Sequence, residues 1–283
     1  MRLSTESVKY DLESLREKQI PLLKCIDKVC REHHLRYYLW AGTLLGAVRH
    51  QGFIPWDDDM DIAMPRPDYN LLMEHYREWM PQPYEVIGPH NRPDYPYPFA
   101  KAVDASTTLI ERPDFNFPEG VFLDIFPLDG YPSDLQANKK NLSNYHFWRH
   151  LLFLRGRDPF KHGKGPRSWW PLLIHKLFTL KWIQNKVQDI MTQYDYEESD
   201  HVIDHDFNER GIIRKSWLGE PKLHEFEGEE YMGPADADAY LTHIYGDYMT
   251  LPPKEKQVQH VYLYLNLTLP YREYARQNNI CIE

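Results

Sequence analysis

Four carboxylates lie close together in the segment IPWDDDMDIAM, at Asp57, Asp58, Asp59 and Asp61. Side chains of a strand alternate between its two faces, so an extended backbone would place Asp57, Asp59 and Asp61 on one face. Like charges at this spacing repel, and a bound cation is the usual reason for a protein to keep them together. Carboxylate oxygens suit magnesium, manganese or calcium. An acidic surface loop is the ordinary alternative, but the apolar residues on both sides favour a metal site at the edge of a buried element.

A glycine turn precedes these acids in the chain. The apolar residues 37–41 predict a strand that enters the turn Gly42-Thr43, and residues 44–50 predict a short helix that follows it. The free N–H groups at a helix N-terminus favour phosphate, and Arg49 adds a positive charge nearby. The segment therefore predicts phosphate groups on one side and a metal on the other.

Two further charged residues occur in apolar segments downstream. Asp124 lies in EGVFLDIFPLDG, with Phe122 and Phe126 beside it on its own strand face. A lone carboxylate is costly to bury unless it is paired or binds a metal, so Asp124 is predicted to be a further metal-site carboxylate or a general base. Lys101, in the strand-like segment FAKAVDASTT, is either a phosphate- or metal-site group or half of a surface pair with Asp104.

The composition is that of an ordinary soluble globular protein. The 283 residues are 42% hydrophobic and 27% charged, and a net charge of −9 argues against nucleic-acid binding. Three cysteines without a CxxC pair argue against a disulfide framework or a zinc module and fit a reducing compartment. The N-terminus lacks the apolar run of a secretory signal, and no apolar stretch is long enough to span a membrane. We therefore expect a cytoplasmic protein.

Residue spacing in the rest of the chain predicts both helices and strands. Helical spacing of apolar residues predicts one or two helices over 5–34, with a kink or restart at Pro21. Strand-like segments follow at 84–87 and 99–103. The stretch 195–210, rich in acids and histidines, is expected to be a solvated loop.

The middle of the chain differs from the rest in charge. Residues 139–186 hold eleven lysines or arginines and one acid, Asp158. Within them, 161–183 mixes aromatic and aliphatic residues with cations, which is typical of a helix on an anionic membrane surface. The two alternatives are a peripheral contact with the inner membrane face and a basic helical insert packed against the acidic core. Composition divides the chain into a catalytic core with N-terminal helices (1–135), a basic aromatic helical insert (136–190) and a C-terminal helical part completing the core (191–283).

The segment GTLLGAVRHQGFIPWDDDMDIAMPRPDY, residues 42–69, closely resembles the main motif of the LicD family. FAKAVDASTT, GVFLDIFPLDG and YGDYMTLPP, with His260 downstream, resemble the family's later blocks in the same order. Together they span nearly the whole chain apart from the basic middle. The family belongs to the nucleotidyltransferase-fold superfamily and is similar to fukutin-related protein, although the scarcity of cysteines here leaves no zinc-binding insert of the kind found in that protein.

The resemblance implies an α+β fold, with a nucleotidyltransferase-like mixed β-sheet flanked by helices, and it assigns eight residues to the site. Mg²⁺ (or Mn²⁺) would be bound by Asp57 and by the three residues also expected to act in catalysis, Asp59, Asp61 and Asp124. The donor phosphates would contact Gly42, Thr43, Arg49 and Lys101.

The resemblance also implies a reaction. Characterised relatives transfer phosphocholine from CDP-choline to cell-surface glycans such as teichoic acid or lipopolysaccharide, and others in the wider group use CDP-ribitol. The first hypothesis is therefore a metal-dependent phosphocholine transferase that releases CMP and acts on a free or lipid-linked glycan. The second is the same fold with another CDP-linked donor, carrying ethanolamine, a phosphonate, ribitol or glycerol. The third is a metal- or nucleotide-binding module without catalysis. Choline favours an aromatic cage, which 20 tyrosines, 12 phenylalanines and 8 tryptophans permit.

Overall fold

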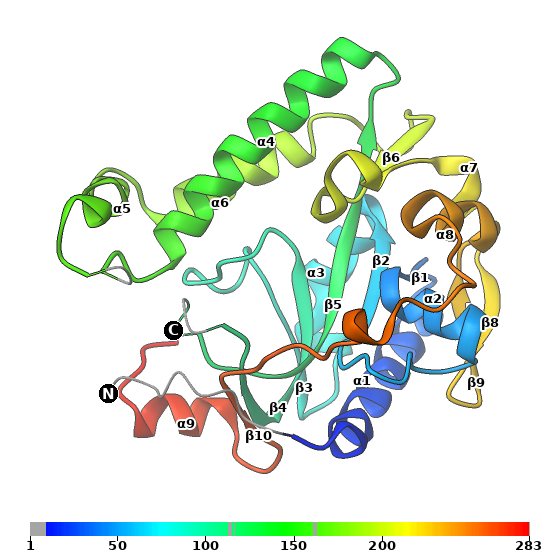
Figure 1. The fold of residues 1–283 in the computed structure, drawn as a ribbon, viewed down its shortest axis with the longest axis horizontal. Coiled ribbons are helices and arrows are strands. Elements are labelled where there is room, and N and C mark those ends of the chain that lie inside the picture. The colour runs from blue at the N-terminus through cyan, green and yellow to red at the C-terminus, as the bar shows by residue number, and fades with distance from the viewer. Residues whose placement is uncertain (1–9, 113–114, 116, 161–162, 283) are drawn as a thin grey trace.

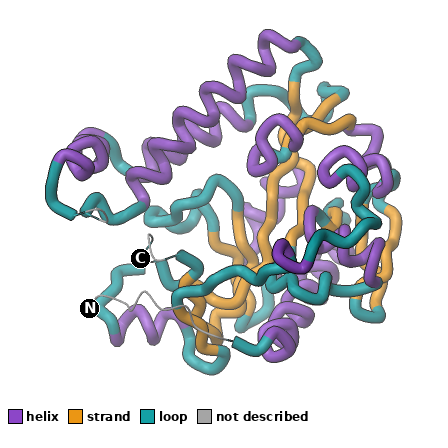
Figure 2. The backbone as a smooth tube through the Cα atoms, viewed as in Figure 1, coloured by secondary structure: helices purple, strands orange, loops and turns teal. Residues whose placement is uncertain are grey.

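The computed structural model describes residues 10–112, 115, 117–160 and 163–282. The strands of its main sheet are β1 (Tyr38–Leu39), β2 (Asp61–Pro65), β3 (Tyr84–Ile87), β4 (Ala100–Ile110), β5 (Glu119–Tyr131), β6 (His201–Ile203), β7 (Ile212–Arg214) and β10 (Tyr264–Asn266). Within this described part, β1, β2, β5, β4 and β10 lie side by side in that order. The strand β3 pairs with β4, and β6 and β7 extend the sheet from the end of β5 (Figure 2).

One strand pair in this sheet determines which charged residues meet. The strands β2 and β5 run parallel, and their register places Asp61 beside Asp124. The strand β4 runs antiparallel to β5 and places Lys101 opposite the same aspartate. Residues paired across neighbouring strands point to the same face of a sheet. The three side chains therefore form one row across β4, β5 and β2.

Helices cover this sheet. They are α1 (Leu12–Glu32), α2 (Ala41–His50), α3 (Arg66–Trp79), α7 (Lys215–Leu218), α8 (Ala237–Tyr245) and α9 (Tyr271–Gln277), with 3₁₀ turns at His205–Gly211 and Lys254–Lys256. The helix α1 begins at the N-cap Asp11, whose side chain accepts a hydrogen bond from the Ser14 N–H, and it packs against β4 and β5. The helix α3 packs against β2, β3 and β5. A separate hairpin, β8 (Lys222–Phe226) and β9 (Glu229–Gly233), packs against α2 and β1.

Three helices form an arm that extends away from the sheet (Figure 1). These are α4 (Leu135–Gly156), α5 (Pro166–Leu177) and α6 (Leu180–Met191). The arm has its own buried cluster, which includes Tyr145, Leu152, Ile183 and Val187. None of the helices in the described part of the chain combines the length and apolarity that crossing a bilayer requires.

The predicted α+β fold is confirmed, including a mixed sheet with flanking helices and a helical middle segment. The strand predicted at 84–87 is β3, whereas α1 continues through Pro21 as one helix. The alternation predicted for the acidic run is wrong in part, because only Asp61 of that run belongs to a strand. The C-terminal part, expected to be helical, also contributes β6, β7 and β10 to the main sheet.

The solvated loop predicted at 195–210 is also wrong. It contains β6, and Asp204 and His205 are buried. The carboxylate of Asp204 accepts a hydrogen bond of 2.7 Å from the indole N–H of Trp40, the residue that precedes α2. Polar residues in this segment are buried because they bind distant parts of the chain, which local polarity does not reveal.

A buried ion pair joins the start of α3 to the end of β5. The guanidinium of Arg66 donates two hydrogen bonds, of 2.5 and 2.8 Å, to the carboxylate of Asp129. The Asp129 side chain is 1% exposed and that of Arg66 is 10% exposed. Removing one partner of such a pair leaves a buried charge uncompensated, which is far more costly than losing an exposed pair.

We predict that Asp129→Ala lowers the free energy of unfolding by about 3–5 kcal/mol, because the guanidinium of Arg66 stays buried without its carboxylate. Urea denaturation followed by circular dichroism measures this loss. The matched control is Glu32→Ala, which removes an exposed partner of Lys28 and should change stability by less than about 1 kcal/mol. Equal effects of the two substitutions would contradict the assigned role of the buried pair.

Candidate active site

The acidic site forms where β2 begins beside the middle of β5. The backbone N–H of Asp61 donates a 2.8 Å hydrogen bond to the hydroxyl of Thr43, and the Asp61 carbonyl accepts one of 3.0 Å from Trp40. The start of α2 is thereby fixed against the first residue of β2. The Thr43 hydroxyl accepts this hydrogen bond, so its own O–H, together with backbone N–H groups of the glycine turn, remains able to donate to a phosphate.

Asp57 lies against the first turn of α2. A Cβ atom on Gly42 would lie 2.7 Å from Oδ2 of Asp57, so the glycine is what allows the carboxylate to approach the helix. The preceding Ala41 has a φ of 41°, a left-handed conformation that L-residues rarely adopt. No side chain caps this end of α2. The structure begins α2 at Ala41, so Gly42 and Thr43 belong to its first turn instead of forming the predicted separate turn before residue 44, and Gly42 brings the helix N-terminus into contact with the acidic run.

A cavity of about 250 Å³ opens beside these residues. Three of the predicted carboxylates line it, Asp59 and Asp61 from the acidic run and Asp124 from β5. Its other polar lining residues are Glu111, Arg112, Arg149 and Asp206, and its apolar lining is formed by Ala41, Pro96, Tyr97, Pro98, Phe99, Phe115, Phe126, Phe153 and Phe207.

The acids of this site repel one another in a buried setting. Burial and the neighbouring Asp59 and Asp58 raise the pKa of Asp57 to about 7. Burial is also the largest cause that raises the pKa of Asp61 and of Asp124 well above the usual aspartate range. In addition, Oδ1 of Asp124 is buried without a hydrogen-bond partner. A cluster of oxygen donors with uncompensated charge fits a hard divalent cation.

Lys101 lies beneath the carboxylates. It is 1% exposed, and its ammonium lies 3.0 Å from Glu111, 3.1 Å from Glu119 and 3.7 Å from Oδ1 of Asp124. Burial alone would lower the pKa of Lys101, but Asp124, Glu111 and Glu119 raise it well above the usual lysine range, so the side chain stays charged. The structure therefore gives Lys101 a buried ion-pair role instead of the expected phosphate contact.

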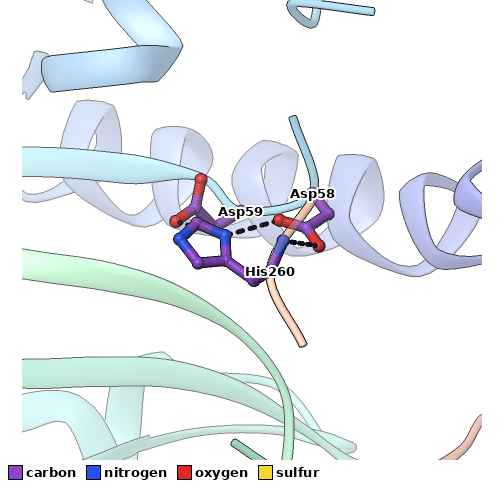
Figure 3. Close-up of side chains that lie close together, drawn as sticks. All are labelled: Asp58, Asp59 and His260. Carbon is purple, nitrogen blue, oxygen red and sulfur yellow. Dashed lines mark hydrogen bonds and ion pairs between the residues drawn. The ribbon is translucent and has the colours of Figure 1, made fainter. Parts of the chain in front are cut away.

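Asp58, in the middle of the acidic run, is not part of the cavity lining and binds His260 of the C-terminal segment (Figure 3). Its Oδ1 accepts a 2.6 Å hydrogen bond from Nδ1 of His260, and its Oδ2 accepts from the backbone N–H of His260 and from the hydroxyl of Tyr10. The hydrogen bond with Asp58, helped by Asp59, raises the pKa of His260 to about 9. Asp58, Asp59 and His260 have ligand atoms within 4.8 Å of one another, but both oxygens of Asp58 are already hydrogen-bonded. We assign Asp58 a structural role.

The cations that line the cavity differ from the predicted ones. Arg49 lies in the last turn of α2 and donates a 2.6 Å hydrogen bond to the carbonyl of Tyr248, outside the lining. Arg112 and Arg149 line the cavity instead. Sequence reasoning passed over both, although Arg149 belongs to the basic middle segment that composition singles out.

Comparison with known proteins shows a family resemblance. A family model described as "LicD/FKTN/FKRP, nucleotidyltransferase domain" matches residues 34–162, which include all eight predicted site residues. The chain is 28% identical over 260 residues to the lipopolysaccharide cholinephosphotransferase LicD of Haemophilus influenzae, covering 87% of this chain and 96% of that protein. It is 30% identical over 132 residues to an uncharacterized protein of Rickettsia prowazekii, covering 46% of this chain and 47% of that one. The predicted resemblance is confirmed.

The ion pairs of Lys101 give a prediction about stability. Lys101→Met should lower the free energy of unfolding by about 3–5 kcal/mol, because Glu119 and Asp124 lose their buried counter-charge. Adding Glu119→Gln should restore part of the loss, since it removes one of the unpaired charges. Chemical denaturation of both variants tests this.

The matched control for that experiment is Lys18→Met, whose ammonium is 37% exposed and lies 3.9 Å from Asp104. It should change stability by less than about 1 kcal/mol. A Lys101→Met protein as stable as the wild type would show that the three carboxylates do not depend on the lysine.

Proposed function

Because the chain belongs to the LicD family, we propose that it transfers phosphocholine from CDP-choline to a hydroxyl of a cell-surface glycan and releases CMP. The name of the Haemophilus relative supports lipopolysaccharide as the class of acceptor. The observation that carries the proposal is the cavity lined by Asp59, Asp61 and Asp124 together with a wall of aromatic rings. The acids suit a diphosphate with its metal, and the rings suit a quaternary ammonium.

The proposed metal is Mg²⁺ or Mn²⁺, held by Asp59, Asp61 and Asp124 with Asp57 as a further ligand. The raised pKa values in the cluster and Oδ1 of Asp124, which accepts no hydrogen bond, support this choice, since a divalent cation would relieve both. When bound, the ion would offset the negative charge of the donor's diphosphate during transfer.

The residues around the metal position the reactants. The start of α2 lies beside Asp57 and has no side-chain cap, so the N–H groups of Gly42 and Thr43 would donate to the diphosphate, as free helix N-termini do. The acceptor hydroxyl oxygen attacks the phosphorus that bears choline, and the bond from that phosphorus to the CMP oxygen breaks. The hydroxyl proton passes to a carboxylate, and Asp124 is either that base or a metal ligand. The products are the phosphocholine ester of the glycan and CMP.

The aromatic wall supports choline as the head group. Ring centroids are 4.5 Å apart for Phe99 and Phe126, 5.4 Å for Phe99 and Tyr97, and 6.0 Å for Tyr97 and Phe115. Phe153 of α4 continues the series at 5.3 Å from Phe115. Aromatic faces attract a trimethylammonium group, which has no N–H to satisfy. A primary ammonium or a polyol would lose hydrogen bonds to water against the same wall.

We predict that Asp61→Asn lowers CMP release from CDP-choline by at least about a thousandfold, on the scale of losing a group that stabilises the transition state. In EDTA the same variant should melt roughly 2–4 °C above the wild type, because one buried repulsive charge is gone. The measurements are CMP release with acceptor and Mg²⁺, and thermal unfolding by circular dichroism. Glu255→Gln, at an exposed acid, is the control and should change neither. Wild-type turnover in Asp61→Asn would rule out the assigned site.

A second prediction concerns the head group. Phe153→Leu should lower kcat/KM for CDP-choline by about tenfold while leaving the value for CDP-ethanolamine nearly unchanged, because cation–π attraction is lost for the quaternary ammonium. The control is Phe147→Leu, at an exposed ring of the same helix outside the cavity. An equal loss with both donors would place the ring against cytidine instead, and a wild-type preference for CDP-ribitol or CDP-glycerol would replace choline as the head group.

A further inference from the structure

The outermost helix of the arm, α5, exposes large apolar side chains. Trp169 is 68% exposed and Leu177 is 59% exposed, values more typical of charged residues than of tryptophan and leucine. The full exposed set is Trp169, Trp170, Leu172, Leu173 and Leu177. Five such residues within a twelve-residue helix form a contiguous patch, and patches of this kind mark interaction surfaces.

The exposed residues share one face of α5. With 100° per residue, Leu172, Trp169, Leu173, Leu177 and Trp170 span roughly 160° of the helix circumference. The opposite face holds Ser168, Pro171 and Ile174, which are buried against the rest of the arm. Most amphipathic helices bury their more apolar face. In α5, by contrast, the buried face is no more apolar than the exposed one.

Hydrogen bonds hold α5 in this orientation. Nε2 of His175 lies 3.3 Å from the carbonyl of Leu154 and 3.2 Å from that of Arg157, both at the end of α4. Nε of Arg155 donates a 2.9 Å hydrogen bond to the carbonyl of Phe178, just after α5. With these contacts on one side, the tryptophan face points outward from the arm.

The charges around this face are all of one sign. Lys164, Arg167 and Lys176 are exposed, and Lys176 lies within the apolar face itself. The sequence has no acidic residue from 159 to 188, although the whole chain carries a net charge of −9. A positive, tryptophan-rich face on a negative protein complements a negatively charged apolar interface, which is what an anionic bilayer presents.

We propose that α5 is an interfacial helix that docks the protein on an anionic membrane surface, with its tryptophan and leucine side chains at the headgroup–acyl boundary. Tryptophan favours that boundary, and Lys164, Arg167 and Lys176 reach anionic headgroups at its rim. A second copy of the chain would cover the apolar residues but would bring together two basic surfaces. The charge therefore selects the lipid surface over self-association. This inference is independent of the proposed transfer reaction.

The arm links this surface to the cavity. The helix α4 contributes Arg149 and Phe153 to the cavity lining and leads directly into α5 (Figure 1). Docking of α5 would hold the cavity at a fixed distance from the membrane. A glycan acceptor carried on a lipid would then reach the site without leaving the bilayer.

The test is flotation of the full-length protein with vesicles of phosphatidylcholine alone or with about 30 mol% phosphatidylglycerol. The wild type should float with the anionic vesicles and be released by high salt, because screening weakens headgroup attraction. Trp169→Ser/Trp170→Ser should lower the partition coefficient by about tenfold or more. Arg167→Gln and Lys176→Gln should each lower it by about fivefold on anionic vesicles only.

Controls separate docking from folding and from self-association. Leu223→Ser removes a leucine that is 50% exposed on β8, far from the arm in sequence, and should float like the wild type. Unchanged thermal unfolding shows that the tryptophan variant is folded. A wild type that does not float, or a tryptophan variant that floats equally well, would overturn the proposal. So would a wild-type dimer in light scattering that the tryptophan variant converts to a monomer without any lipid binding.

Discussion

The parallel pairing of β2 with β5 is the constraint on which the site depends. Because Asp61 lies beside Asp124 in that register, two carboxylates must lie next to each other on one face of the sheet. The antiparallel partner β4 then places Lys101 on the other side of Asp124. Across β4, β5 and β2 the row consists of the cation Lys101 followed by the acids Asp124 and Asp61. The negative charge is therefore in excess at the end of the row that faces the cavity. The missing hydrogen bond at Oδ1 of Asp124 and the raised pKa values of this cluster are consequences of that imbalance.

The remaining parts of the site are arranged around this row. The acidic run supplies Asp57 and Asp59 from irregular backbone, so their carboxylates approach from outside the sheet while Asp61 belongs to it. Asp58, between them, turns the other way and is held by His260 and Tyr10 near the two ends of the chain. Fixing the middle residue of the run limits how far its neighbours can spread apart under their mutual repulsion. Holding these repelling carboxylates close together lowers the stability of the fold, as is common at functional sites.

The sequence predicts those parts of the site that depend on residues close together in the chain, and it misses those that depend on tertiary contacts. The glycine turn, the acidic run and Asp124 in its apolar strand are recognisable because each is unusual within its own short segment. The partners of Lys101 cannot be recognised in this way. Glu119 and Glu111 approach it only through the register of β4 and β5 and through the segment that joins these two strands. Arg149 reaches the cavity only through the direction of α4, which no local pattern encodes. The fold class was predictable, whereas the charge pairing was a tertiary property.

For the arm, too, the sequence predicts the composition of a segment but not how its side chains pack. Composition marks residues 161–183 as basic and aromatic, yet it leaves open whether their apolar side chains pack inward or face solvent. In α5 the structure answers this question. Ser168, Pro171 and Ile174 occupy the face that packs against the arm, so the tryptophans face solvent. A helix that buries its less apolar side against its own protein loses hydrophobic stabilisation in water, by about 25 cal/mol for each Å² of apolar surface left exposed. That loss is recovered only when another apolar phase covers the face, and the positive charge around it selects an anionic one.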